Sequence, residues 1–305
     1  MRRHDRLLAE AYGTPWAVTP ERAGVIAAIL RRIEAGERAD DDTVRAAIEA
    51  KRQKPKQART AVAVLPVFGT LVQRADVFDQ MSGATSTESL GQQLDEFAAD
   101  PSVEAIILDI DSPGGSVYGV EEFCQKMASA MRQKKCIAVA DSLAASAAYW
   151  IASQASELVV TPNGEVGSIG VYMMHRDVSK AMEAAGEAVT FISAGERKTA
   201  GHPYGPLDDL SRAELQSGVD DYYAKFVRAV ARGRNVSQTA VREGFGRGGM
   251  VRAEQAVREG MADKVGTLDD VLARYGVRAA DLMPAAAKET GLDYEIEVRK
   301  RKLRM

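Results

Sequence analysis

The sequence predicts an α/β fold, in which buried strands of one sheet alternate with helices. Two observations support this prediction. From residue 61 onward, short apolar runs rich in branched residues recur, and longer segments with apolar residues at helical spacing lie between them. The chain has 305 residues, 46% of them hydrophobic and 27% charged, which suits one substantial core with appendages.

The first 60 residues predict an N-terminal helical extension. Thr19 and Pro20 are residue types that cap and open a helix, and apolar residues follow at helical spacing as far as Ile33. Residues 40–60 are polar and basic, and we interpret them as a linker. We therefore expect three parts: an extension (1–60), a core (61–275) and a flexible C-terminal tail (276–305).

The first half of the core predicts strands joined by helices. A capping box formed by Thr85 and Glu88 predicts a helix that ends near residue 99. A glycine-rich turn after the second strand leads into a helix that ends near residue 135, and a short helix is expected to begin near Ser146. The strands are expected at 61–67, 105–110 and 136–140.

The second half of the core predicts a long helix after three further strands. A capping box formed by Ser211 and Glu214 marks the expected start of this helix, which carries apolar residues along one side. The strands are expected near 158–161, 169–173 and 188–192, and shorter helices at about 176–185, 236–243 and 252–259.

Charge, cysteine content and hydropathy argue against a nucleic-acid-binding, metal-binding or membrane-spanning protein. The formal net charge of −3 gives no overall attraction to nucleic acid, and the basic clusters at 51–59 and 299–304 lack interleaved aromatic residues. Cys124 and Cys136 lie in apolar patterns without metal-ligand spacing, so we expect buried thiols in a reducing compartment. No stretch reaches the roughly 18 apolar residues of a membrane span. We expect a cytoplasmic protein without metal or cofactor.

A glycine-rich segment directly after a predicted strand is the first candidate for a catalytic element. The sequence Asp-Ser-Pro-Gly-Gly-Ser at 111–116 lets the backbone approach a substrate closely, and amides that open a helix face a bound anion. Gly114 and Gly115 therefore fit an oxyanion hole. Taken alone, however, the pattern favours a strand-to-helix turn that requires positive φ over an oxyanion hole.

A single serine among alanines is the second candidate. Ser146 lies in the sequence Ala-Ala-Ser-Ala-Ala-Tyr-Trp at 144–150. Small neighbours favour a nucleophile at a strand-to-helix corner, where the next amide, that of Ala147, faces the carbonyl oxygen of a substrate. An alanine-rich buried helix with an incidental serine also fits this pattern.

The residues alone do not identify the base that would activate this serine. We interpret His4, His175 and His202 as surface or structural histidines, and no Gly-x-Ser-x-Gly elbow is present. A lysine replaces histidine where burial disfavours the charged form. Lys198 lies in a loop that leaves a predicted strand, so it is able to turn inward, although most loop lysines face solvent.

Taken together and in this order, the motifs resemble those of the signal peptide peptidase A-like family of serine peptidases. The resemblance covers about residues 61–275 and implies a Clp-protease/crotonase-like fold, with a superhelical core of strand–strand–helix units. The segments that carry it are the oxyanion loop at 111–116, the nucleophile segment at 145–149, the strand Gly-Ser-Ile-Gly-Val at 167–171, the Gly-x-x-Lys at 195–198 and the closing segment at 246–266.

The resemblance also implies a role for each site residue. It makes this chain a Ser-Lys dyad peptidase that works through an acyl-enzyme. The implied residues are the nucleophile Ser146, the base Lys198, the oxyanion amides of Gly115 and Ala147, Gly114, which shapes the turn, and Ser168, which orients the lysine.

Among soluble members, the chain resembles the capsid-assembly proteases of tailed phages and prophages. This resemblance implies polypeptide substrates, including capsid and scaffold proteins, a homo-oligomer, and a location in the cytoplasm or in an assembling procapsid. Three alternatives remain open: a housekeeping peptidase of the same family, a crotonase-like acyl-CoA enzyme in which Ser146 has no role, and an assembly protein with an inactive site.

Overall fold

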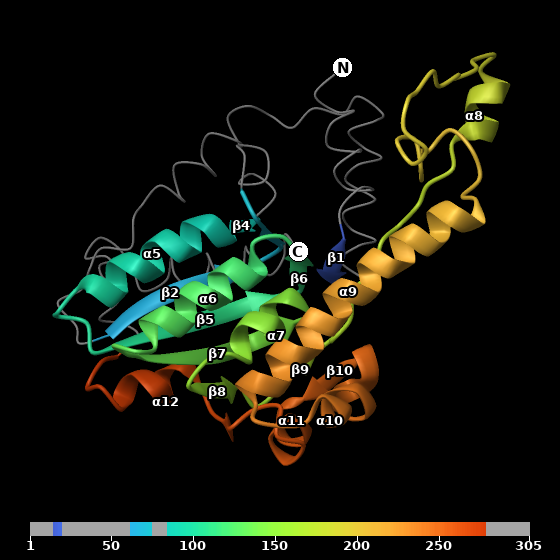
Figure 1. Ribbon diagram of the computed structural model, residues 1–305. Helices are drawn as coiled ribbons and strands as arrows, with labels where there is room; N and C mark the ends of the chain where they lie inside the picture. The colour runs from blue at the N-terminus through green and yellow to red at the C-terminus, as the bar shows by residue number, and fades with distance from the viewer. Residues whose placement is uncertain (1–14, 20–61, 75–83, 279–305) are drawn as a thin grey trace.

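A mainly parallel β-sheet forms the centre of the fold (Figure 1). The computed structural model describes residues 15–19, 62–74 and 84–278. Neighbouring strands follow the order β10-β9-β7-β5-β2, while β7 also pairs with β8, and β8 with β11. Among the described strands of this sheet, only β9 and β10 pair antiparallel. The strands are β2 (Val62–Phe68), β5 (Ala105–Ser112), β7 (Lys135–Ala145), β8 (Glu157–Val160), β9 (Glu165–Gly167), β10 (Met250–Arg252) and β11 (Lys264–Val265).

Four predicted strands are confirmed and two predictions are wrong. The confirmed strands are β2, β5, β7 and β8. Residues 169–173 form only an isolated bridge at Tyr172, because the chain turns at Ser168, where φ is +53°, directly after β9. Residues 188–192 form no strand, since no sheet lies beside them; Ile192 is 100% exposed.

Helices cover both faces of the sheet. One face packs against α5 (Thr87–Ala99), α6 (Val120–Ala130) and α7 (Ala147–Ala152) in the larger apolar core. The other face packs against α12 (Leu268–Ala273), and Ile107, Val139 and Leu272 belong to this second core. Alternating side chains of each strand enter the two cores, as expected for strands buried on both faces.

Both predicted capping boxes are shifted. The N-cap of α5 is Ser86, whose hydroxyl accepts the Ser89 amide, while the Thr85 hydroxyl donates to the Phe68 carbonyl. Both residues form β4 (Thr85–Ser86), which pairs with β3 (Leu71–Val72). The long helix α9 (Asp209–Gly233) begins earlier than predicted, since the Asp208 side chain accepts the Ser211 amide and acts as the cap. Within helix α9, the hydroxyl of Ser211 also donates to Asp208.

An arm extends from the body of the molecule. It consists of α8 (Ser179–Ala184), the following loop and the first turns of α9, and Figure 1 shows it projecting beyond the sheet. The last turns of α9 pack on the body, where the rings of Phe226 and Trp150 stack 4.7 Å apart. The remaining predicted helices are confirmed as α8, α10 (Gln238–Glu243) and α11 (Ala253–Arg258), with a 3-10 turn η1 (Phe245–Gly248) between the last two.

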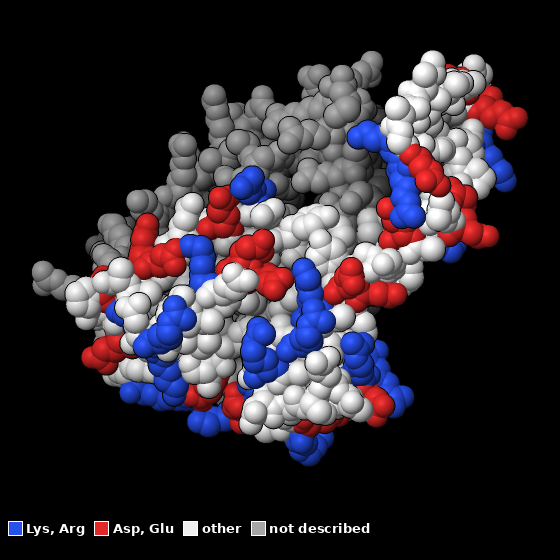
Figure 2. All heavy atoms as spheres, viewed as in Figure 1, with Lys and Arg blue, Asp and Glu red and all other residues white. Residues whose placement is uncertain are grey.

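Several predictions fall outside the described residues. These are the helical extension and linker beyond residue 19, the basic clusters, and the tail beyond residue 278. Within the described ranges, no helix combines the length and the apolar character that crossing a bilayer requires. Lys, Arg, Asp and Glu side chains are interspersed over the face of the described surface shown in Figure 2.

The two cysteines are buried free thiols, as predicted. Burial raises the pKa of the Cys124 thiol to about 12 and that of Cys136 to about 11. Both side chains therefore stay protonated at neutral pH, and the reactive thiolate form is disfavoured.

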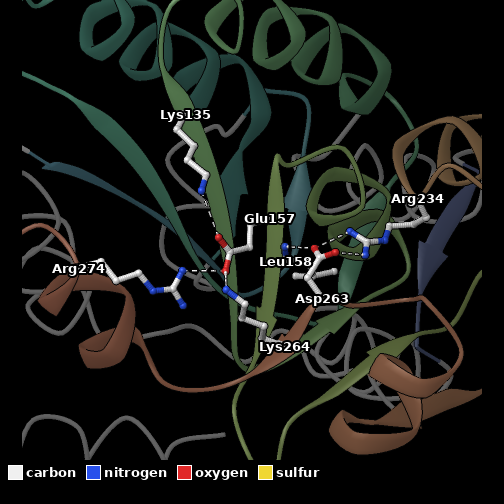
Figure 3. A network of polar contacts seen from close by, with 7 residues as sticks. All are labelled: Lys135, Glu157, Leu158, Arg234, Asp263, Lys264 and Arg274. Atoms are coloured by element: carbon white, nitrogen blue, oxygen red, sulfur yellow. Dashed lines mark hydrogen bonds and ion pairs between the residues drawn. The ribbon is translucent and has the colours of Figure 1, made fainter.

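Two carboxylates, Glu157 at the start of β8 and Asp263 directly before β11, tie the C-terminal segment to the sheet (Figure 3). Glu157 accepts from Arg274 at 2.7 Å and from Lys264 at 3.1 Å, while Lys135 lies 3.4 Å away. Burial alone would raise the pKa of Glu157, but the hydrogen bonds from Arg274 and Lys264 outweigh it and hold the pKa below its usual range. This contribution to stability is therefore present at neutral pH and is lost in acid.

Asp263 makes the second connection in Figure 3. Its two oxygens bind the guanidinium of Arg234 at 2.7 and 2.9 Å, and one of them also accepts the Leu158 amide at 2.7 Å. The side chain of Arg234 is only 7% exposed, so this bidentate pair joins the end of α9 to the edge of the sheet.

A third carboxyl, that of Asp109 on β5, gives the first testable prediction. Burial, with the nearby charges of Asp141 and Asp111, raises its pKa to about 7. Because the folded state holds this proton more tightly than the unfolded chain, stability falls as pH rises from about 4 to about 7. We expect Asp109→Asn to raise the free energy of unfolding by about 1–3 kcal/mol at pH 8 and to change it little at pH 4.

Urea unfolding of both proteins at the two pH values measures this difference. Asp221→Asn, at an exposed position of α9, is the matched control and should have a small effect at either pH. An equal change at pH 4 and pH 8 for Asp109→Asn would contradict the prediction.

Candidate active site

Ser146 occupies a strained corner between β7 and α7. Its backbone has φ +55° and ψ −120°, a conformation that L-residues rarely adopt, and the residue is 1% exposed. The corner is held by the Ser146 amide, which donates to Gly167 at 2.7 Å, and by the Ser146 carbonyl, which accepts from Trp150 at 2.9 Å. Strain of this kind costs about 1–3 kcal/mol and concentrates at functional sites.

The helix that follows the serine is firmly anchored. All six residues of α7 are buried, and the Tyr149 hydroxyl donates to the Met261 carbonyl at 3.0 Å. Trp150, one turn after Ser146, stacks on Phe226 of α9. These contacts fix the position of the Ala147 amide at the start of the helix, and a fixed donor needs no reorganisation during a reaction.

The glycine loop lies directly beside this corner. Gly114 has φ +90°, and a Cβ at this residue would lie 2.9 Å from the Ala147 nitrogen. A Cβ on Gly115 would lie 2.0 Å from the Leu71 carbonyl oxygen, so both positions require glycine. The loop runs as β6 (Gly114–Ser116), between β3 and a further strand.

Ser168 belongs to the same neighbourhood. It follows β9, whose last residue Gly167 pairs with Ala145, the residue before the candidate nucleophile. Ser168 is 8% exposed, and its amide donates to the Gly249 carbonyl at 2.8 Å. The structure therefore brings together the glycine loop, the Ser146 corner and Ser168, three segments that are far apart in the sequence.

Within one copy of the chain, Lys198 lies apart from this site. It is exposed and lies in the loop of the arm, next to Arg197, which pairs with Glu214 in the first turns of α9. Phe226, which contacts the helix of the nucleophile, is twelve residues further along α9, or roughly 18 Å at the rise of an α-helix. Figure 1 shows the loop that follows α8 on the outer part of the arm, away from the sheet.

The histidines lie on the arm as well. His175 Nε2 is 3.1 Å from the His202 carbonyl oxygen, and His202 Nδ1 accepts the Tyr204 amide. Both therefore take part in the internal contacts of the arm, while His4 lies outside the described residues.

The sequence analysis missed a strand at the site. Residues 16–18 were assigned to the helical extension, but they form β1 (Trp16–Val18), which pairs antiparallel with β6. The sequence Trp-Ala-Val does indicate a strand weakly, since tryptophan and valine favour strands. A run of three residues is too short to be assigned without its pairing partner.

A pocket of about 130 Å³ lies beside β6 and α7. Tyr118, Trp150, Tyr222 and Lys225 are among the residues that line it. The indole N–H of Trp150 has no hydrogen-bond partner among the described residues, although the side chain is buried. Aromatic side chains and the charged side chains of Glu121, Glu122 and Lys225 therefore share the walls of the pocket.

Comparisons with known proteins identify a family and several relatives. The model of peptidase family S49 matches residues 128–281, a range that includes Ser146, Ser168 and Lys198. Capsid assembly protease C of Escherichia phage lambda is 34% identical over 223 residues, covering 72% of this chain and 50% of the phage protein. Head-tail preconnector protein GP5 of Enterobacteria phage P21 is 32% identical, covering 69% and 42% respectively.

A bacterial relative shows the same similarity. Protease 4 of Haemophilus influenzae is 28% identical over 215 residues, covering 69% of this chain and 34% of the relative. The chain thus spans half or less of the length of these three relatives. The match to the family model extends over half of the chain and contains the strained serine corner, and on this basis the chain belongs to peptidase family S49.

Proposed function

We propose that the protein is a serine endopeptidase with a Ser-Lys dyad. The observation that carries this proposal is the strained Ser146 corner beside the glycine loop in a chain of this family. Its parallel strands and the small second sheet that contains β6 also support a core of the Clp-protease/crotonase type.

In the proposed reaction, the Ser146 hydroxyl attacks the peptide carbonyl while Lys198, as an uncharged amine, accepts its proton. The lysine then gives the proton to the leaving amine, and water hydrolyses the acyl-enzyme. The amides of Gly115 and Ala147 stabilise the oxyanion, and one such donor is worth about 3 kcal/mol of barrier. Ser168, beside the nucleophile, orients the lysine.

The exposed position of Lys198 leads us to propose that a neighbouring copy supplies it. A base on an arm that projects from its own body reaches a serine of the next subunit if the copies form a closed ring. The arm carries apolar side chains that its own body leaves uncovered, as expected of a surface that packs on a partner. Their exposed fractions are 43% for Val189, 45% for Phe191, 100% for Ile192 and 53% for Leu210.

The proposed substrates are capsid and scaffold proteins of a phage or prophage, cleaved in the cytoplasm inside an assembling procapsid. The similarity to a capsid assembly protease and to a head-tail preconnector protein supports this choice of substrate.

Incubation with capsid and scaffold proteins encoded beside this gene tests the substrate class. We expect mass spectrometry to find new termini at defined bonds, and none with the Ser146→Ala protein. Hydrolysis of generic peptides without cleavage of these proteins would replace the maturation role with a housekeeping one. Covalent labelling of Ser146 by a serine-directed probe, without any peptide cleavage, would contradict the endopeptidase proposal itself.

A further inference from the structure

The strand β1 lies between β6 and Tyr172, close to the corner that holds Ser146. On one side, the Val117 amide donates to the Pro15 carbonyl at 3.3 Å, and the Thr19 amide donates to the Pro113 carbonyl at 3.2 Å. On the other side, the backbone of Trp16 exchanges hydrogen bonds of 2.9 and 3.0 Å with the backbone of Tyr172. Figure 1 shows β1 beside β6. The segment is thus held by backbone hydrogen bonds along both edges, as an added strand would be.

The register of this strand places Ala17 opposite Gly115. Residues two positions to either side, Pro15 and Thr19, make hydrogen bonds to the glycine loop, so Ala17 and Gly115 occupy a hydrogen-bonding position of the ladder. The Gly115 amide therefore faces the Ala17 carbonyl. This is one of the two amides assigned to the oxyanion hole.

The second oxyanion amide is close to the same carbonyl. A Cβ built on Gly114 would lie 2.2 Å from the Ala17 oxygen and 2.9 Å from the Ala147 nitrogen, so both atoms border the same point above the glycine. Ala17 is 0% exposed and Val18 is 3% exposed. These two residues are therefore buried, and the small side chain of Ala17 occupies the position beside the nucleophile.

We propose that residues 15–19 are an internal pseudosubstrate, which fills the peptide-binding groove and must leave before another polypeptide enters. This inference rests on the proposed function for the meaning of the groove. It assigns the groove between β6 and Tyr172 to an extended peptide that runs antiparallel to β6 and has a small residue at the position of Ala17. The protein is then latent until the segment is displaced.

Peptide binding tests the inference without any need for activity. The probe is a fluorescent nonapeptide with the sequence of residues 13–21, and the receptor is the Ser146→Ala protein. Ala17→Pro in that background removes the Ala17 N–H from the ladder and so weakens β1. Ala17→Gly keeps both backbone groups and is the matched control. Circular dichroism and thermal unfolding check that each variant is folded.

We expect the apparent dissociation constant of the peptide to be about tenfold lower for Ala17→Pro than for Ala17→Gly. The reason is that β1 occupies the groove in most molecules of the Gly variant, so only a small fraction of them is able to bind the peptide. Val18→Asp, which places a charge at a buried position of the same strand, should have the same effect. Equal dissociation constants for the folded Ala17→Pro and Ala17→Gly variants would overturn the inference.

Hydrogen exchange gives a second readout, measured on the Ser146→Ala protein without any substitution in β1. Saturating peptide should speed the exchange of the amides of residues 16–19, because the peptide displaces the strand. Unchanged protection of those amides would overturn the inference even if the variants prove unstable. If the peptide displaces β1 but the wild-type protein cleaves no polypeptide, the groove assignment stands and the proposed peptidase function fails.

Discussion

The Ser146→Ala variant is expected to lose peptidase activity by a factor of about 10⁵ in kcat, since removal of a nucleophile leaves only binding and the oxyanion hole. The residue is 1% exposed in a corner whose backbone conformation is already fixed, and alanine removes one oxygen atom without adding volume. The fold should therefore survive. The loss should appear in kcat, measured with a fluorogenic peptide, at an unchanged thermal unfolding midpoint.

Ser153→Ala is a matched control on the same helix. Ser153 is also fully buried, and its hydroxyl donates to the Trp150 carbonyl at 2.8 Å, so its removal should cost about 1 kcal/mol of stability and little activity. If Ser146→Ala retained activity within a factor of ten of the wild type, Ser146 would not be the nucleophile.

The Lys198→Ala variant is expected to be inactive to a similar extent, although in one copy its side chain is exposed on the arm. Loss of the base leaves the Ser146 hydroxyl without a proton acceptor. Lys180→Ala, at an exposed position of α8 on the same arm, is the matched control and should keep its activity.

Co-expression of Ser146→Ala with Lys198→Ala tests whether the two residues come from different copies. In a mixed oligomer with equal amounts of each variant, about a quarter of the sites combine an intact serine with an intact lysine from the neighbour. Activity should therefore return to roughly this fraction of the wild type, and light scattering should show an oligomer. Full-sized mixed oligomers without any regained activity would show that the lysine does not act across subunits.

Local signals in the sequence were enough to place most elements of the fold. The buried strands β2, β5 and β7 were predicted because short runs of branched apolar residues are typical of strands that are buried on both faces of a sheet. The capping residues of α5 and α9 were shifted by one and three positions, because Ser86 and Asp208 are equally good caps and the Thr85 hydroxyl donates to the Phe68 carbonyl instead.

The errors have a common cause. The run at 188–192 has strand-like composition, yet it lies on the arm without a neighbouring strand, and Ile192 is left exposed. Residues 16–18 were assigned to a helical extension, yet they pair with β6, nearly 100 residues away in the sequence. Strand formation depends on a partner, and a partner is a property of the whole fold.

The sequence by itself determined the α/β order of elements and the chemically distinctive segments, because apolar periodicity, glycine at positive φ and a serine among small residues are local properties. Only the tertiary structure decided which of these segments meet. It joined Gly114, Ala147 and Ser168 around the strained Ser146, left Lys198 on an exposed arm, and seated β1 in the groove between them. These outcomes depend on strand pairing and long-range packing, whose hydrogen bonds connect residues that no sequence pattern relates.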